Sequence, residues 1–176
     1  MRSSPVGYGG WGEGVIEIRA FVPADLPALT GLMAEFHRFI EGVDDLARIQ
    51  YEPDAAQVMV DRMVGDAASR GGFVDVAIDE GLVVGFVAGM VEQPSREALM
   101  EGIRSQGGRV TDLFVSERWR GNGIGRRLME QAERRLVAAG CETLRVEVFA
   151  PNMLARRVYA SMGYVERDLQ LIKPVR

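Results

Sequence analysis

Arg120-Gly121-Asn122-Gly123-Ile124-Gly125 separates a strand-like run, residues 110–115, from an amphipathic stretch, residues 124–139. Its three glycines permit sharp turns and leave backbone N–H groups uncovered by side chains. A helix that begins at such a loop adds its own unpaired N–H groups and the positive end of its dipole. Strand, glycine loop and helix N-terminus together predict a binding site for a phosphate or pyrophosphate group.

Two arginines in the first helical turn, Arg126 and Arg127, support that interpretation. Cations at this end of a helix oppose its dipole, at a cost of about 0.3–1 kcal/mol each. A bound polyanion would reverse the sign of that energy. The alternative is that both side chains extend into water, and we favour the anion site because Arg118 and Arg120 lie close by in the sequence.

The spacing of the glycines narrows the class of phosphate ligand. A P-loop requires a lysine directly after its last glycine, and the only lysine of the chain is Lys173. The dinucleotide pattern G-x-G-x-x-G fails because position 126 is arginine. The pattern that fits is Arg-x-x-Gly-x-Gly, at Arg120, Gly123 and Gly125. In this motif the chain resembles the GNAT superfamily of acetyl-CoA-dependent N-acetyltransferases, in which the motif wraps the pyrophosphate of coenzyme A.

The resemblance continues downstream and is specific over residues 109–164. Leu144-Arg145-Val146-Glu147-Val148 is followed by Asn152, Ala155, Arg156, Tyr159 and Gly163-Tyr164, which is similar to the second half of the family pattern. The resemblance implies acetyl-CoA as the co-substrate. It also implies donor contacts from a set of residues on the fourth strand, the glycine loop and the last helix: Leu113, Phe114, Val115, Arg120, Gly121, Asn122, Gly123, Ile124, Gly125, Arg126 and Asn152.

Hydrophobic periodicity predicts one mixed α/β domain over residues 15–176, preceded by a flexible glycine-rich tail, residues 1–14. The expected order is β-α-α-β-β-β-α-β-α-β, which predicts a mostly antiparallel central sheet with helices on both faces. The resemblance implies that the sheet opens between its fourth and fifth strands. We expect strands at residues 15–21, 73–78, 82–91, 110–115, 143–149 and 164–172, helices from about 23 to 40 and at 53–69, 124–139 and 152–162, and a short helical turn within 96–103.

Composition sets outer limits on function. The 176 residues are 47% hydrophobic with a net charge of −4, and no apolar run approaches the length of a membrane span. An acidic chain argues against a nucleic-acid partner and is compatible with a cationic substrate. The single Cys141 rules out an internal disulfide, which indicates a reducing cytoplasm. No cluster of His, Cys or Asp has metal-ligand spacing, so no metal is expected.

Acetyl transfer to an amine requires a base, because an alkyl ammonium has a pKa of about 10 and only the neutral amine attacks. Glu147 is the first candidate, on the strand face opposite Leu144, Val146 and Val148; some family members that acetylate protein N-termini have a glutamate base at this position. The alternative is a solvated carboxylate. Asp112 is the second candidate, as base or as ligand of the amine, in predicted register with Val110 and Phe114. His37, the only histidine, is a weaker one.

A departing CoA thiolate also benefits from a proton. Tyr159 lies seven residues after Asn152 and matches the general acid of the family, although a core aromatic is the competing explanation. Asn152 suits a helix N-cap, and the resemblance adds a contact with the pantetheine arm. The resemblance further assigns polarisation of the thioester carbonyl to the main chain of residues 113–115.

The function expected from these residues is transfer of an acetyl group from acetyl-CoA to a primary amine by direct attack in a ternary complex. No histidine lies near Cys141 in the sequence to support a covalent acyl-enzyme. A non-catalytic CoA-binding module and another acyl-CoA donor remain alternatives. The acceptor, small or peptidic, stays open: four acids could attract a cationic amine or could form a solvated acidic face, namely Glu35, Glu41, Asp44 and Asp45. Dimerisation is frequent in the family, so a homodimer is a further expectation.

Overall fold

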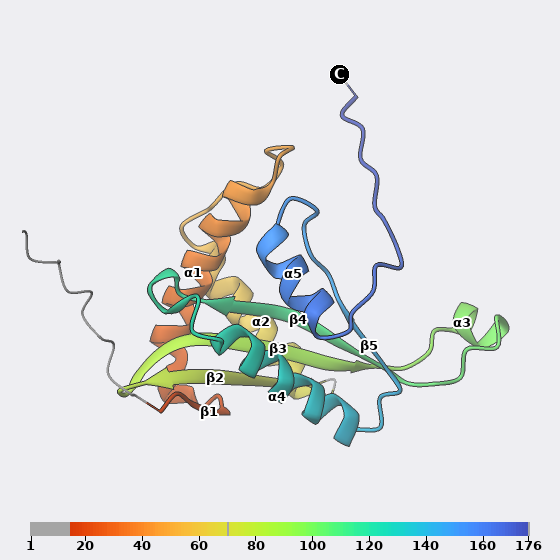
Figure 1. Cartoon of the computed structure of the whole chain (residues 1–176), viewed down its shortest axis with the longest axis horizontal. Helices are drawn as coiled ribbons and strands as arrows, with labels where there is room; N and C mark the ends of the chain where they lie inside the picture. Colours follow the sequence, from red (N-terminus) through yellow and green to blue (C-terminus); the bar gives the residue numbers. More distant parts are fainter. Residues whose placement is uncertain (1–14, 70, 176) are drawn as a thin grey trace, which may run out of the picture.

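A computed structural model describes residues 15–69 and 71–175 of the chain (Figure 1). The predicted tail, residues 1–14, lies outside the described residues. The elements follow in the order β1 (Glu17–Ala20), η1 (Pro23–Asp25), α1 (Leu26–Val43), α2 (Ala55–Ser69), β2 (Phe73–Asp79), β3 (Leu82–Glu92), α3 (Arg96–Met100), β4 (Gly107–Val115), η2 (Glu117–Trp119), α4 (Ile124–Ala138), β5 (Thr143–Val146) and α5 (Met153–Ser161).

The five described strands form one sheet in the order β1-β2-β3-β4-β5, antiparallel except for the parallel pair β4–β5. The hairpin between β2 and β3 turns at Glu80 and Gly81, whose φ angles are 47° and 83°. Positive φ at both central residues is typical of a type I′ turn, which matches the twist of the flanking strands. The mixed, mostly antiparallel sheet predicted from the sequence is therefore confirmed.

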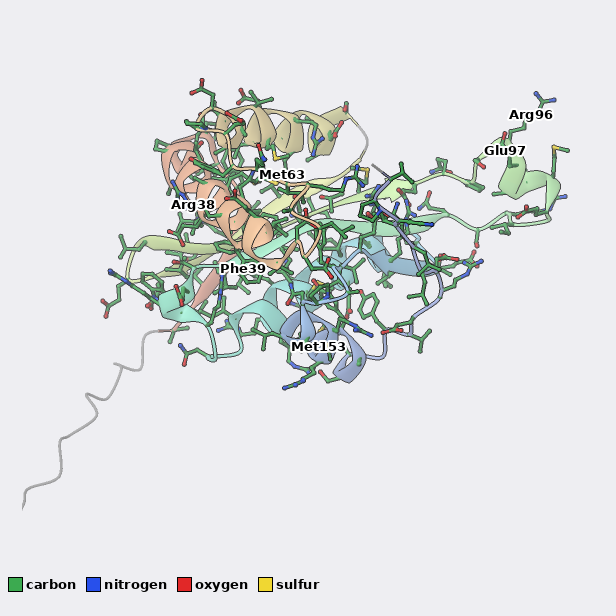
Figure 2. The ribbon with its side chains drawn as sticks, turned by 90° about the horizontal axis from the view of Figure 1, so that it is seen from above. Arg38, Phe39, Met63, Arg96, Glu97 and Met153 are labelled. Atoms are coloured by element: carbon green, nitrogen blue, oxygen red, sulfur yellow. The ribbon has the colours of Figure 1, made fainter. Side chains whose placement is uncertain are left out.

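Helices cover both faces of the sheet, as the sequence predicts (Figure 2). The first core cluster lies against α1 and α2 and includes Leu29, Met33, Val60 and Phe86. The second lies against α4 on the opposite face and includes Leu128, Leu136, Val87 and Tyr159 of α5. Helix α2 buries Ala56, Val60 and Met63 and leaves Val58 65% exposed.

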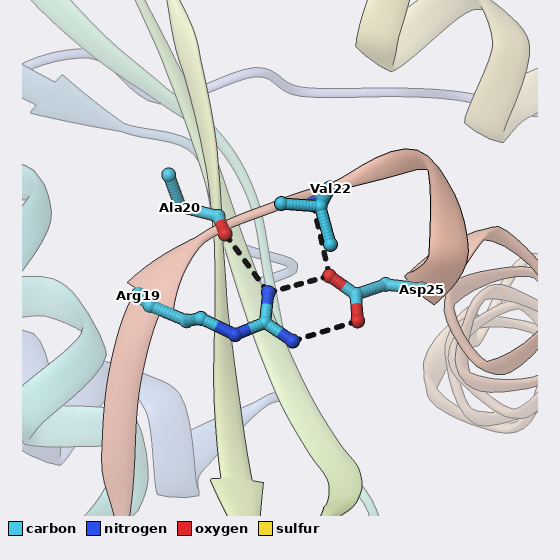
Figure 3. A network of polar contacts seen from close by, with 4 residues as sticks. All are labelled: Arg19, Ala20, Val22 and Asp25. Carbon is cyan, nitrogen blue, oxygen red and sulfur yellow. Dashed lines mark hydrogen bonds and ion pairs between the residues drawn. The ribbon is translucent and has the colours of Figure 1, made fainter.

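The start of α1 is held to β1 by a buried carboxylate (Figure 3). Both Nη atoms of Arg19 donate to Asp25, at 2.7 and 2.8 Å, and the backbone N–H of Val22 donates to the same carboxylate at 2.9 Å. The hydrogen bonds from Arg19 hold the pKa of Asp25 below its ordinary value. Because a bidentate pair fixes direction as well as distance, it sets where α1 leaves the sheet.

Strands β4 and β5 pair over only part of β4. The register joins Gly107–Val110 to Thr143–Val146, after which the chain leaves β5 three residues before its predicted end. Residues 112–115 of β4 therefore pair with β3 and have no strand partner on the β5 side within the described sheet. This divergence is the opening that the family resemblance implies.

The predicted strand at residues 164–172 is wrong, because no strand is assigned there in the described chain. Val165, Leu169 and Leu171 of this segment are exposed at 86%, 77% and 92%. A strand requires a neighbouring edge with which to form its ladder, and a local pattern of side chains cannot supply one.

Candidate functional site

The glycine loop presents open backbone at the start of α4. Gly121 and Gly123 have φ angles of 83° and 75°, and a Cβ built on either would meet nothing within 4 Å. Gly123 is the N-cap of α4 without a side-chain hydrogen bond, and the first intrahelical bond runs from Arg127 N to Gly123 O at 3.1 Å. The N–H groups that precede Arg127 in the first turn have no intrahelical acceptor. Loop and helix start thus have the shape and polarity of an anion site.

Arg120 reaches back from the loop instead of lining it. Its Nε donates to the carbonyl oxygen of Val115 at 2.9 Å. Its guanidinium lies 4.7 Å from the ring centroid of Phe39 and 5.2 Å from that of Phe114. Figure 2 shows Phe39 on α1, near the middle of the picture. Arg120 therefore fixes the loop to the end of β4, and its main chain is the part that belongs to the anion site.

The other predicted arginine of the loop also has partners within the chain. Arg126 Nη2 donates to Ser161 Oγ at 2.6 Å, and its Nη1 lies 3.9 Å from Glu130. Its neighbour Arg127 donates to the carbonyl oxygen of Ile16 at 2.7 Å. Asn122 donates to the carbonyl oxygen of Trp119 at 3.3 Å, within the loop. These side chains tie α4 to α5 and β1 while the backbone of the loop stays open.

Alternation along β4 decides which main-chain groups face the opening beside β5. Ser116 N donates to Val84 O at 2.9 Å, and Phe114 pairs with Phe86, so both residues point their main-chain groups at β3. Leu113 and Val115 therefore point theirs away from β3. Phe114, predicted as a donor contact with them, instead places its ring in the core against Phe36 at a centroid distance of 5.3 Å.

A β-bulge displaces Asp112 from its predicted register. Ala88 pairs with Asp112 and Gly89 with Val110, which leaves Thr111 as the extra residue of β4. Val110 packs on the α4 side, whereas Phe114 packs on the α1–α2 side. The expectation that Asp112 shares a face with both is wrong for Val110, because the bulge reverses the alternation. Arg109 and Asp112, three residues apart, consequently face the same pocket.

Asp112 is the most strongly desolvated of the predicted catalytic carboxylates. Burial raises its pKa, against the hydrogen bond from Thr111 and the charges of Arg62, Arg109 and His37. Burial also lowers the pKa of His37 on α1. A carboxylate of this kind holds a proton more readily than an exposed one, which suits a general base.

Glu147 lies beyond the end of β5, so its predicted place on a strand face is wrong. Its side chain is 70% exposed, and its Oε1 lies 3.0 Å from Arg109 Nη2. The strand ends at Val146 because the pairing with β4 ends there. Glu147 is thus an exposed member of a charged cluster in which Glu92 accepts two hydrogen bonds of 2.7 Å from Arg145.

The two predicted residues of α5 occupy the positions that their local sequence indicates. Asn152 Oδ1 accepts from Ala155 N at 3.2 Å, so the helix cap is confirmed. Tyr159 is 8% exposed, with its ring centroid 5.9 Å from that of Tyr164. Burial raises the pKa of Tyr159 to about 12, so its phenol keeps its proton near neutral pH.

Two of the four acids considered for the acceptor are engaged within the chain. Glu35 Oε2 accepts from Ser116 Oγ at 2.8 Å, which joins α1 to the end of β4. Asp44 accepts from the N–H groups of residues 46, 48 and 49, and these bonds lower its pKa. Glu41 and Asp45 are exposed. The acids near the end of α1 therefore stabilise local structure more than they form a joint site.

A pocket of about 270 Å³ lies between α2 and the bulged part of the sheet. Sequence reasoning found Asp112 and missed its charged neighbours, because α2, β3 and β4 each contribute some of them. The helix residue Arg62 is an exposed polar position with no motif around it, so no local signal could have identified it. The polar lining consists of Arg62, Asp66, Glu92, Arg109, Thr111 and Asp112.

Comparisons with known proteins identify a family to which the sequence is similar. The model of the acetyltransferase (GNAT) family matches residues 36–164. An uncharacterized N-acetyltransferase of Methanocaldococcus jannaschii is 34% identical over 95 residues, which are 53% of this chain and 53% of that protein. The matched part thus spans about half the length of that relative.

Two solved structures share the fold. A mutant of the BH1408 protein of Bacillus halodurans has a TM-score of 0.73 at 21% identity, covering 91% of this chain and 99% of that one. The aminoglycoside N-acetyltransferase AAC(6')-Iy in complex with CoA has a TM-score of 0.67 at 16% identity, covering 97% and 99%. Across the residues that the structure describes, no helix combines the length and apolar character needed to cross a bilayer.

Proposed function

We propose, since the chain belongs to the acetyltransferase (GNAT) family, that it transfers an acetyl group from acetyl-CoA to a primary amine within a ternary complex. The observation that carries this proposal is the adjacency of two features along the chain. The open loop at Gly121 and Gly123 directly follows the stretch of β4 that β5 leaves unpaired. One feature suits a pyrophosphate, and the other suits an extended amide-containing arm.

Donor binding follows from the main chain of these two features. The N–H groups of the loop and the first turn of α4 bind the pyrophosphate, because a Cβ-free backbone lets phosphate oxygens approach. Leu113 and Val115 face the opening with their main-chain groups, and Arg120 already occupies the Val115 carbonyl oxygen. This leaves both groups of Leu113 and the N–H of Val115 to pair with the pantetheine arm and to polarise the thioester carbonyl.

The chemical step then needs one proton acceptor and one proton donor. Asp112 takes the proton of the ammonium, and the neutral nitrogen attacks the thioester carbon to give a tetrahedral oxyanion held by main-chain N–H groups. The C–S bond breaks as the carbonyl re-forms, and Tyr159 donates its proton to the leaving thiolate. The nitrogen of the new amide gives up its second proton, which restores the Tyr159 phenol. Burial of Asp112 favours it over the exposed Glu147 as the base. Cys141 is buried with a raised thiol pKa, which supports direct attack instead of an acyl-enzyme.

The test is release of CoA thiol with a panel of primary amines, in the wild type and in Asp112→Asn, Glu147→Gln and Tyr159→Phe. We expect kcat to fall about 100-fold or more in Asp112→Asn and Tyr159→Phe, and to stay near the wild-type value in Glu147→Gln. Loss of turnover in Glu147→Gln alone would move the base to Glu147. Tight binding of acetyl-CoA without turnover of any amine would favour a non-catalytic CoA-binding module. Faster turnover with a longer acyl-CoA would identify that acyl-CoA as the donor instead of acetyl-CoA.

A further inference from the structure

The pocket beside Asp112 is small and closed on several sides. Its walls come from α2, β2, β3 and β4, and its volume is about 270 Å³. Pockets for drug-sized ligands have volumes of about 300–1,000 Å³. A cavity of this size encloses a molecule of amino-acid size, whereas a long polyamine or a peptide would extend out of it.

The bulge at Thr111 places this pocket next to the opening between β4 and β5. The β4–β5 pairing ends at Val110, and the next two residues, Thr111 and Asp112, line the pocket. A molecule in the pocket therefore lies on one side of β4, where the strand leaves its parallel neighbour. In the proposed reaction the attacking amine must bind at this position, beside the opening between β4 and β5.

The two arginines that line the pocket, Arg62 and Arg109, differ in their ion pairs. Arg109 lies 3.0 Å from Glu147 and 3.8 Å from Glu92, so two carboxylates share its charge. Arg62 and Asp66 of α2 belong to the same lining, and the ion pairs among residues 15–69 and 71–175 do not include Arg62. Its charge does act on Asp112. The pocket thus holds a desolvated carboxylate, Asp112, and a guanidinium, Arg62, that forms no ion pair within the described residues.

We infer that the acceptor is a small molecule carrying both a primary amine and a carboxylate, an amino acid or a close analogue, with its amine at Asp112 and its carboxylate at Arg62. The inference rests on the proposed function and adds the substrate class. A guanidinium presents a planar pair of donors that matches a carboxylate. A plain amine would leave Arg62 without a ligand, and an aminoglycoside would extend beyond the pocket.

The experiment compares matched acceptors that differ only in the carboxylate. Each α-amino acid is assayed against its primary carboxamide in the wild type, Arg62→Gln and Arg104→Gln, the last being an exposed arginine outside the pocket. We expect the wild type and Arg104→Gln to prefer the acid by about tenfold or more in kcat/KM. Arg62→Gln abolishes that preference by raising KM for the acceptor, with KM for acetyl-CoA unchanged.

Measuring acceptor binding without turnover tests the inferred substrate class independently of the proposed function. The same acid and amide pairs are titrated calorimetrically into CoA-saturated protein, which requires no turnover. Tighter binding of the acid, lost in Arg62→Gln, supports the inference even if no amine is acetylated, in which case the proposed function fails alone. Equal or better binding of the amide, no binding of either, or an unchanged preference in Arg62→Gln would overturn it.

Discussion

The Nε of Arg120 donates a 2.9 Å hydrogen bond to the carbonyl oxygen of Val115, and the guanidinium lies over the rings of Phe39 and Phe114. One side chain thus joins the glycine loop, the end of β4 and α1. The loop proposed to bind the donor is therefore held in a fixed position relative to β4 and α1. The Arg120 side chain makes its contacts within the protein, so we expect it to affect donor binding indirectly, through the position of the loop.

Arg120→Met should weaken donor binding and the fold together. It removes a hydrogen bond from a charged group, worth about 1.5–3 kcal/mol, and a cation–π contact of about 0.5–2 kcal/mol. We expect the free energy of unfolding, measured in urea, to fall by about 1–3 kcal/mol and KM for acetyl-CoA to rise. Arg104→Met serves as the control with an exposed arginine. A rise in KM without loss of stability would indicate direct contact with the donor instead.

The pH dependence of catalysis should report Asp112. A base acts only when it is ionised, and burial raises the pKa of Asp112 above the ordinary value of about 3.9. The kcat/KM of the wild type should therefore fall as the pH decreases through that raised pKa. Asp112→Glu should retain an acid limb at a shifted position, and Asp112→Asn should lack one. An unaltered acid limb in Asp112→Asn would assign the limb to another group.

The buried carboxylate of Asp75 makes the free energy of unfolding depend on pH. Asp75 of β2 is fully buried, pairs with Arg135 of α4, and has its pKa raised by burial. The folded state therefore binds the proton more tightly than the unfolded chain. The stabilisation that protonated Asp75 contributes is fully present below the pKa of Asp in the unfolded chain, about 3.9. It is lost as the pH rises through the higher pKa of Asp75 in the folded state.

Asp75→Asn provides the check, because the amide keeps the shape and cannot titrate. The Tm of the wild type and of Asp75→Asn is measured from pH 4 to pH 8. The Tm of the wild type should decrease relative to that of Asp75→Asn as the pH rises. A wild type that gains relative stability over this range would show that the ion pair with Arg135 outweighs the cost of burying the charge.

Local sequence predicts those features of the fold that depend on local physics. Asn152 caps α5, and Gly140 and Gly163 adopt φ angles of 88° and 93° where helices end. Each outcome is decided within a few residues, by a capping hydrogen bond or by the absence of a Cβ. The glycine loop belongs to this class, because its glycines and the following amphipathic helix are adjacent in the chain.

The remaining features depend on partners distant in the sequence. The bulge at Thr111 exists only in the register of β4 against β3, and it decides which side Asp112 faces. The ring of Phe39 that covers Arg120 comes from a helix near the start of the chain. The charged pocket combines Arg62 of α2 with residues of two strands. Neither propensity nor spacing encodes such relationships, so the family resemblance could indicate the donor site but not the acceptor pocket.

Calorimetric titration of CoA into Gly123→Glu tests the central claim most directly. The substitution puts bulk and negative charge at an open backbone position with φ of 75°. Gly102→Glu is the matched control, since Gly102 has φ of 85° and equally open surroundings away from the loop. We expect unchanged affinity for Gly102→Glu and a loss of about 100-fold or more for Gly123→Glu. Thermal melting verifies that both variants are folded. Equal affinity of Gly123→Glu and wild type for CoA would contradict it.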